Sequence, residues 1–84
     1  MKKQLIIKVT QHDIDNGKRR SPNCCPIALS MQRRTGQNVE VDFETVRFGH
    51  HRGFPITRKM EIWMSEFDAG LPVEPTAFFV DYAL

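Results

Sequence analysis

The stretch "ITRKMEIWMSEFDAG", residues 56–70, decides the fold more than any other part of the sequence. At 100° per residue its large apolar side chains fall within one arc, which predicts an amphipathic helix with one buried face. Thr57 is a typical N-cap and Gly70 a typical residue beyond a helix end, so we expect the helix to run to residue 68 or 69. Ile62 lies on the opposite face. The expected core residues of this helix are Ile56, Met60, Trp63, Met64 and Phe67.

Alternation of apolar and polar residues predicts β-strands on both sides of this helix. Residues 4–10, 38–44 and 77–84 alternate in this way, and residues 45–48 continue or pair with the second of these segments. Residues 49–55 contain two glycines and end in a proline, so we expect a loop there. In the strand at 38–44, the side chains expected to face inward are Val39, Val41 and Phe43.

A second helix is predicted to begin in the stretch "NCCPIALS", residues 23–30. Pro26 suits the first turn of this helix, because no backbone N–H is needed there. At helical spacing Cys24 shares a face with apolar residues of the helix, whereas Ser30 lies toward the other side. We therefore expect Cys24 to pack in the core as a small apolar residue. The face that includes Cys24 is completed by Ile27, Ala28 and Met31.

The predicted order of elements is strand, helix, strand, strand, helix, strand. A brief helical turn capped by Thr10 and Asp13, and stopped at Gly17, follows the first strand. The 84 residues suffice for one domain, residues 1–84. We predict an α+β fold in which two helices cover one face of a mainly antiparallel, four-stranded sheet. A ferredoxin-like split βαβ arrangement and a meander with irregular helices both agree with this order.

Composition and charge favour a binding protein over an enzyme with a deep cavity. A domain of 84 residues needs most of its apolar side chains for its core. The formal net charge is +2, but residues 1–35 carry eight basic and two acidic side chains, whereas residues 60–84 carry five acidic side chains and no basic one. Such a split either creates two faces of opposite charge or lets the two ends neutralise each other. No stretch is apolar for long enough to span a membrane and no signal peptide is recognised, so we expect a cytoplasmic protein with reduced thiols.

The adjacent cysteines raise the question of catalysis or metal binding. A thiolate nucleophile at Cys25 would need a histidine base, and the surrounding sequence has no C-x-x-C and no protease signature. A structural zinc site usually draws on paired ligands two to four residues apart, and adjacent pairs fit this spacing poorly. We therefore predict no catalytic residue, no metal and no cofactor, and we expect the cysteines to pack near the start of their helix. The ligands considered for a metal are His12, Cys24, Cys25, His50 and His51.

Two sets of charged residues are candidates for binding a partner. An acidic set lies on the strand at 38–44 and the helix at 56–70. It predicts binding to a host protein complex, in which these acidic side chains would occupy the partner's nucleic-acid groove. A basic set, interleaved with Phe48 and Phe54, is the alternative and predicts direct binding of nucleic acid. The acidic set comprises Glu40, Asp42, Glu44, Glu61, Glu66 and Asp68. The basic set comprises Arg47, His50, His51, Arg52, Arg58 and Lys59.

Three stretches carry a resemblance to a known group of proteins. They are "IIKVTQHDIDNG" (6–17), "CPIALSMQR" (25–33) and "WMSEFDAGLPVEPTAFFVDY" (63–82). Together they resemble small accessory proteins encoded by bacteriophages and prophages, whose pattern includes the cysteine at Cys25 but not Cys24. The resemblance implies a phage protein that acts in the bacterial host cell by binding a host macromolecular assembly. An inhibitor of an antiviral defence complex is the form of this hypothesis that we carry forward.

Overall fold

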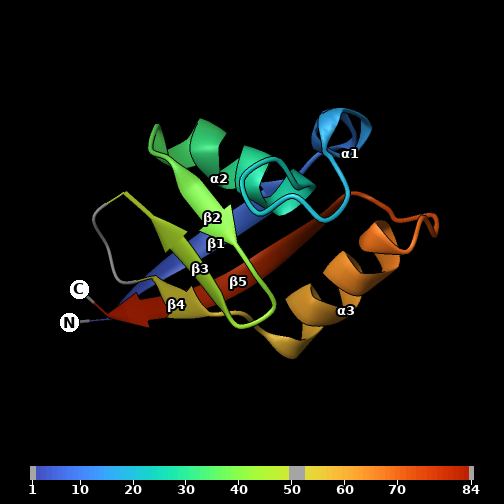
Figure 1. The fold of residues 1–84 in the computed structure, drawn as a ribbon. Helices are drawn as coiled ribbons and strands as arrows, with labels where there is room; N and C mark the ends of the chain where they lie inside the picture. Colours follow the sequence, from blue (N-terminus) through green and yellow to red (C-terminus); the bar gives the residue numbers. More distant parts are fainter. Residues whose placement is uncertain (1, 50–52, 84) are drawn as a thin grey trace.

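The fold is a small α+β arrangement, as predicted, in a computed structural model that describes residues 2–49 and 53–83 (Figure 1). None of the helices in these residues is long and apolar enough to cross a membrane. The elements are β1 (Lys2–Val9), α1 (Gln11–Asn16), α2 (Pro26–Thr35), β2 (Val39–Val41), β3 (Thr45–Phe48), β4 (Phe54–Pro55), α3 (Arg58–Asp68) and β5 (Thr76–Ala83).

The strands form two sheets, so the prediction of one four-stranded sheet is wrong. β1 and β5 pair antiparallel over their full lengths, from Lys2 opposite Ala83 to Val9 opposite Thr76. β2, β3 and β4 form a second antiparallel sheet in that order. β4 lies within the segment predicted to be a loop, and it also contacts β5. Since β4 is two residues long and ends in Pro55, which has no N–H to donate, the ladder does not continue from β4 into β5.

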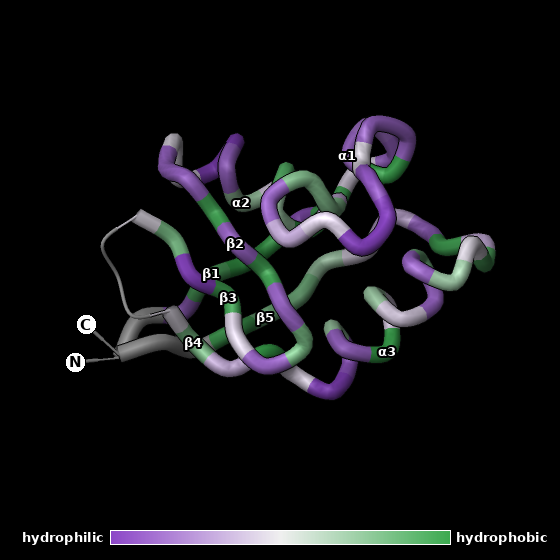
Figure 2. Tube along the Cα trace, viewed as in Figure 1, coloured by the Kyte–Doolittle hydropathy of each residue, from purple (hydrophilic) through white to green (hydrophobic). Residues whose placement is uncertain are grey.

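One hydrophobic core joins the two sheets and the helices. It includes fully buried side chains from both sheets and from α2 and α3, such as Ile7, Ile27, Val46, Met60 and Phe78. α2 contacts β1 and β2, so it bridges the two sheets instead of covering one face of a single sheet (Figure 1). The hydropathy of the trace follows this arrangement, with apolar stretches on β1, β5 and the inner part of the β2–β3 hairpin (Figure 2).

Helix α3 agrees with its sequence pattern. The Oγ1 atom of Thr57 accepts a hydrogen bond from the backbone N–H of Met60 at 3.2 Å, which is the predicted cap. Met60, Trp63, Met64 and Phe67 are buried, Ile56 is partly buried, and Ile62 is 49% exposed. The Trp63 ring stacks on Phe67 with 5.9 Å between centroids, and its Nε1–H donates to the carbonyl oxygen of Glu74 at 3.1 Å. α3 is therefore fixed to the β5 side of the core by apolar packing and by one indole hydrogen bond.

Helix α2 begins at Pro26, after both cysteines, whereas the sequence predicted a start near Cys24 or Cys25. Cys25 is its N-cap and is 5% exposed, and its Sγ accepts a hydrogen bond from the N–H of Ala28 at 3.4 Å. Cys24 therefore lies outside the helix, where helical spacing does not apply, and it is only partly buried. The expectation that Cys24 packs in the core is wrong. Ser30 is also buried, contrary to the prediction, because its hydroxyl donates to the carbonyl oxygen of Lys8 at 2.6 Å.

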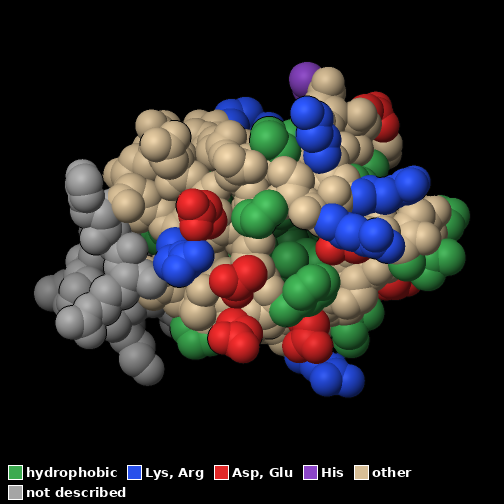
Figure 3. Space-filling model, viewed as in Figure 1, with side chains coloured by type: hydrophobic (Ala, Val, Ile, Leu, Met, Phe, Trp, Pro, Cys, Tyr) green, Lys and Arg blue, Asp and Glu red, His purple; other side chains and the backbone are tan. Residues whose placement is uncertain are grey.

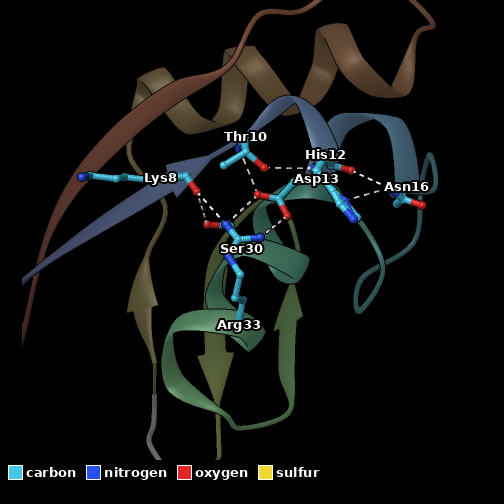
Figure 4. Close-up of polar contacts among 7 residues, drawn as sticks. All are labelled: Lys8, Thr10, His12, Asp13, Asn16, Ser30 and Arg33. Atoms are coloured by element: carbon cyan, nitrogen blue, oxygen red, sulfur yellow. Dashed lines mark hydrogen bonds and ion pairs between the residues drawn. The ribbon is translucent and has the colours of Figure 1, made fainter.

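The predicted turn at Thr10 exists as helix α1, and an ion pair fixes it to α2 (Figure 4). Thr10 and Asp13 form a capping box, in which each side chain accepts a hydrogen bond from the other residue's backbone N–H. Asp13 is only 3% exposed, and its two oxygens accept hydrogen bonds from the guanidinium group of Arg33. The same guanidinium and the Ser30 hydroxyl both donate to the carbonyl oxygen of Lys8. This cluster joins β1, α1 and α2 at one point.

Candidate protein-binding groove

An apolar groove opens between the β2–β3 turn and α3. Its volume is about 240 Å³, and in Figure 3 it is the central apolar depression with acidic side chains on one side and Lys or Arg side chains on the other. Most of its apolar lining also belongs to the core, whereas Phe43 and Pro22 lie outside the core. Its main apolar lining is Pro22, Cys25, Val41, Phe43, Met64 and Phe67. The groove is therefore an opening onto the core rather than a shallow feature of the surface.

Phe43 forms the exposed lip of this groove, although the sequence predicted it to face inward. Its side chain is 52% exposed. The predicted alternation stops because β2 ends at Val41, and one carboxylate oxygen of Asp42 accepts hydrogen bonds from the N–H groups of Glu44 and Thr45, both at 2.7 Å. These hydrogen bonds close a tight turn and lower the pKa of Asp42 below its usual value. The turn redirects Phe43 from the core to the groove.

The loop between α1 and α2 closes the floor of the groove by bonding to both walls. The N–H of Val41 donates to the carbonyl oxygen of Pro22 at 2.7 Å, which ties the loop to the edge of β2. The N–H of Arg20 donates to a carboxylate oxygen of Asp68 at 2.9 Å, which ties the loop to the end of α3. Arg20 has a φ angle of 58°, which costs a non-glycine residue about 1–2 kcal/mol. The two tethers offset this strain and hold Arg20 at the rim.

Basic residues of this loop lie against the carboxyl end of α3. The guanidinium group of Arg19 is close to Gly70, since a Cβ atom built there would lie 3.3 Å from the Cζ of Arg19. α3 has no basic residue in its own last turn. Cations near this end interact favourably with the negative end of the helix dipole. The uneven charge of the sequence allowed either two faces of opposite charge or mutual neutralisation of the two ends of the chain. At this end of the groove the structure has partial neutralisation.

Two of the six acidic candidates line the groove from different walls. Asp42 comes from the β2–β3 turn and Asp68 from the last turn of α3. Glu44 is exposed in the same turn as Asp42. Glu61 precedes Asp68 by seven residues, which places it two turns away on the same side of α3. Carboxylates therefore border the groove on the turn and on the helix.

The other two acidic candidates lie elsewhere. Glu40 forms an ion pair with Arg47, with 2.9 Å between a carboxylate oxygen and Nη2, across the neighbouring strands β2 and β3. Glu66 lines a different depression, next to residues 72–76. The predicted acidic set is therefore divided, and only part of it belongs to one surface.

The basic candidates do not form one described patch. Arg47 is paired with Glu40, and Lys59 donates to the carbonyl oxygen of Ala77 at 3.2 Å. The Nζ atom of Lys59 also lies 5.5 Å from the centre of the Phe78 ring, so this cation is used within the fold. Arg58 is exposed at the start of α3. The remaining members, His50, His51 and Arg52, lie outside the described residues.

The chemistry of Cys25 suits packing more than nucleophilic attack. Burial raises the pKa of the Cys25 thiol, and the nearby Asp68 carboxylate acts in the same direction. A thiol with a raised pKa stays protonated at neutral pH, whereas nucleophilic cysteines need the thiolate. Within residues 2–49 and 53–83, no group of three or more histidine, cysteine and acidic side chains is arranged to hold a metal ion. His12, which is described, lies beside Asn16 on α1.

Comparisons with family models, with curated proteins and with solved structures find no match to this chain. The support for the candidate site therefore comes from the geometry of this chain alone. Sequence reasoning found Asp42 and Asp68 but missed Arg20 and the exposed position of Phe43. One signal for Phe43 was present, because it is an aromatic residue placed between two acidic ones in "DFE", residues 42–44. Asp42 is followed by a turn that its side chain closes.

Proposed function

We propose that this protein acts by binding a protein partner, and that the partner contacts it through the groove and its acidic border. The observation that carries the proposal is the combination of an opening onto the apolar core with the carboxylates of Asp42 and Asp68 on its two walls. Apolar residues at the centre of a surface with charged residues at its border are the usual anatomy of a protein interface. The partner surface that complements this one is basic, with an apolar residue at its centre.

A basic surface of this kind is typical of proteins that bind nucleic acid. The proposal therefore extends to a host macromolecular assembly whose nucleic-acid groove is occupied by the acidic border. In this form the protein is a phage accessory protein in the bacterial cytoplasm, and an antiviral defence complex is one such target. The resemblance of residues 6–17, 25–33 and 63–82 to phage proteins motivates this context, and the groove supports the mode of binding.

The experiment is a tagged pull-down from bacterial lysate with and without nuclease treatment. The test variant D42N/D68N removes two negative charges from the groove, while each asparagine keeps a side-chain oxygen that accepts the backbone hydrogen bonds seen at Asp42 and Asp68. The matched control E66Q/E74Q removes two charges from exposed positions away from the groove. We expect a stoichiometric host protein that survives nuclease, is lost with D42N/D68N and is kept with E66Q/E74Q.

Two results would count against this function. Equal recovery of the partner by D42N/D68N and by the control would show that the acidic border does not bind it. Recovery of nucleic acid, or of proteins that disappear after nuclease treatment, would favour the alternative in which the basic set binds nucleic acid directly. In that case, replacing Arg52 and Arg58 by alanine should weaken binding and reduce its dependence on salt.

A further inference from the structure

We infer that the groove holds one large apolar side chain of the partner, and that lysine or arginine residues flank this side chain in the partner's sequence. This inference rests on the proposed function and adds the chemistry of the bound segment. It makes the groove an anchoring pocket for a short basic and apolar stretch, such as Lys-Leu-Lys, rather than a site for a cofactor.

The size of the groove selects a side chain over a larger ligand. Pockets that bind small molecules and cofactors usually measure about 300–1,000 Å³. The groove measures about 240 Å³ and stays open to solvent on one side. A leucine, methionine or phenylalanine side chain presents a small apolar volume on a short stem, and such buried anchors contribute much of the affinity at protein interfaces.

The lining of the groove favours an apolar group at its floor. Cys25, Met64 and Phe67 each have 8% or less of their surface exposed, so their contact faces are fixed by the core behind them. Phe43 stands beside them with 52% of its surface exposed and can cover an inserted side chain. Thioether and aromatic groups adapt well to apolar partners of varied shape. A charged group placed against these three side chains would lose its water and gain no hydrogen bond from them.

The charged residues at the border of the groove determine which charge is favoured in the partner residues beside the inserted apolar side chain. Asp42 carries a lowered pKa, so its carboxylate stays charged at neutral pH while one of its oxygens bonds the turn. Asp68 lines the groove from the end of α3, and one of its oxygens accepts the N–H of Arg20. Glu44 adds a third carboxylate in the turn. Among the described side chains that line the groove, Arg20 is basic and Asp42 and Asp68 are acidic, and Arg19 lies beside the same end of α3, so a partner's cation is disfavoured beside the loop and favoured toward the β2–β3 turn.

A second apolar position on the surface provides a comparison. Phe79 is 61% exposed on the β1–β5 pair, opposite the partly buried Ile6. Phe79 does not line the groove. Phe43 and Phe79 are therefore the same residue type at similar exposure, one at the groove and one away from it. This pair supplies a matched control for the test.

The test measures binding of synthetic peptides by the fluorescence of Trp63, which is the chain's single tryptophan and lines the groove. The probes are the peptide acetyl-Gly-Lys-Leu-Lys-Gly-amide, a version with alanine in place of leucine, a version with glutamate in place of both lysines, and N-acetyl-leucine amide. We expect the first peptide to bind with a Kd in the millimolar range, and the alanine version to bind at least about tenfold more weakly, which corresponds to about 1.4 kcal/mol. The glutamate version should also bind more weakly, and its disadvantage should shrink as salt is added.

Variants of the protein locate the binding. F43A and D42N/D68N should weaken binding of the first peptide, whereas F79A and E66Q/E74Q should leave it unchanged. Circular dichroism of each variant establishes that it is folded before its binding is compared. Equal binding of the leucine and alanine peptides, or equal binding by F43A and the unchanged protein, would overturn the inference. If N-acetyl-leucine amide binds as well as the basic peptide, the requirement for flanking cations is wrong.

The failure of this inference and the failure of the proposed function give different results. A host protein that depends on D42N/D68N in the pull-down, together with no peptide binding in the fluorescence test, keeps the function and rejects the anchoring pocket. Peptide binding at the groove, together with no host protein in the pull-down, keeps the pocket and rejects the host assembly as the partner.

Discussion

Replacing the buried Asp13 by alanine should strongly destabilise this protein. Asp13 is 3% exposed, and its carboxylate accepts hydrogen bonds from the N–H of Thr10 at 2.9 Å and from two nitrogens of Arg33 (Figure 4). The variant loses the capping bond, which contributes about 1 kcal/mol. It also loses a charge-assisted pair of hydrogen bonds, which contributes about 1.5–3 kcal/mol.

The expected total is a loss of about 2.5–4 kcal/mol in the free energy of unfolding. The upper limit for breaking a fully buried pair, about 3–5 kcal/mol, does not apply, because the side chain of Arg33 is 52% exposed and regains water when Asp13 is removed. A domain of 84 residues has about 4–12 kcal/mol of stability in total. The variant should therefore unfold at clearly lower urea concentration and, at the low end of this range, should be partly unfolded in buffer.

The assay is urea unfolding followed by Trp63 fluorescence and by circular dichroism. The matched control is Asp15→Ala, which removes an exposed carboxylate on the same helix that accepts one hydrogen bond from Gln11. The control should change stability by less than about 0.5 kcal/mol. If Asp13→Ala and Asp15→Ala differ by less than about 0.5 kcal/mol, the reasoning about the Asp13 cluster is refuted.

The pH dependence gives the same prediction a second readout. Burial alone would raise the pKa of Asp13, but the hydrogen bonds from Arg33 and Thr10 outweigh it, so the pKa lies below its usual 3.8. A carboxyl group with a lowered pKa in the folded state stabilises the fold above its unfolded pKa, and this contribution is lost as the pH falls through the folded value. The stability difference between the native protein and Asp13→Ala should therefore be constant above about pH 5 and shrink below about pH 4.

Three further predictions concern backbone and thiol chemistry. Ser30→Ala should cost about 1 kcal/mol in urea unfolding, since the carbonyl oxygen of Lys8 loses its 2.6 Å hydrogen bond from Ser30 and keeps the longer one from Arg33. If stability does not change, this hydrogen bond is dispensable. Gly53→Ala should cost at least about 2 kcal/mol, because φ is 88° and the new Cβ would lie 2.0 Å from the Val46 carbonyl oxygen. Gly36→Ala, with φ of 69° and open space, should cost only about 1 kcal/mol, and equal losses at both sites would contradict the steric argument. A thiol reagent should label Cys24 quickly and Cys25 slowly in the native protein, so Cys24→Ser should remove the fast phase; a fast phase that survives would mean that Cys25 is accessible.

Local chemistry made much of the fold predictable from the sequence. The caps at Thr10 and Thr57 depend on a hydroxyl and a backbone N–H three residues apart, so the sequence specifies them without help from the rest of the chain. The buried face of α3 depends on helical spacing alone. The α+β class follows from these helices and from the alternation in the strands.

The errors arose where a nonlocal contact or a chain reversal overrode a local pattern. Phe43 continues the alternation of β2, but the turn closed by Asp42 reverses the chain one residue earlier. Helical spacing places Ser30 on the predicted exposed face of its helix. Its hydroxyl instead donates a hydrogen bond to the carbonyl oxygen of Lys8, 22 residues away in the sequence. For Ser30 the deciding partner is a backbone group placed by another element, and for Phe43 it is a turn within residues 42–45; the spacing of apolar residues predicts neither.

The candidate site also combines features that the sequence determines with features that only the tertiary structure decides. By itself, the sequence placed Asp42 on the outer face of a strand and Asp68 at the end of a helix, and it indicated that Met64 and Phe67 face the core. Only the tertiary structure decided that these residues border one groove, because the loop at 18–25 binds the edge of β2 through Pro22 and the end of α3 through Arg20. Those two hydrogen bonds join segments about 20 and nearly 50 residues apart in the chain, and local propensity contains no information about contacts of that range.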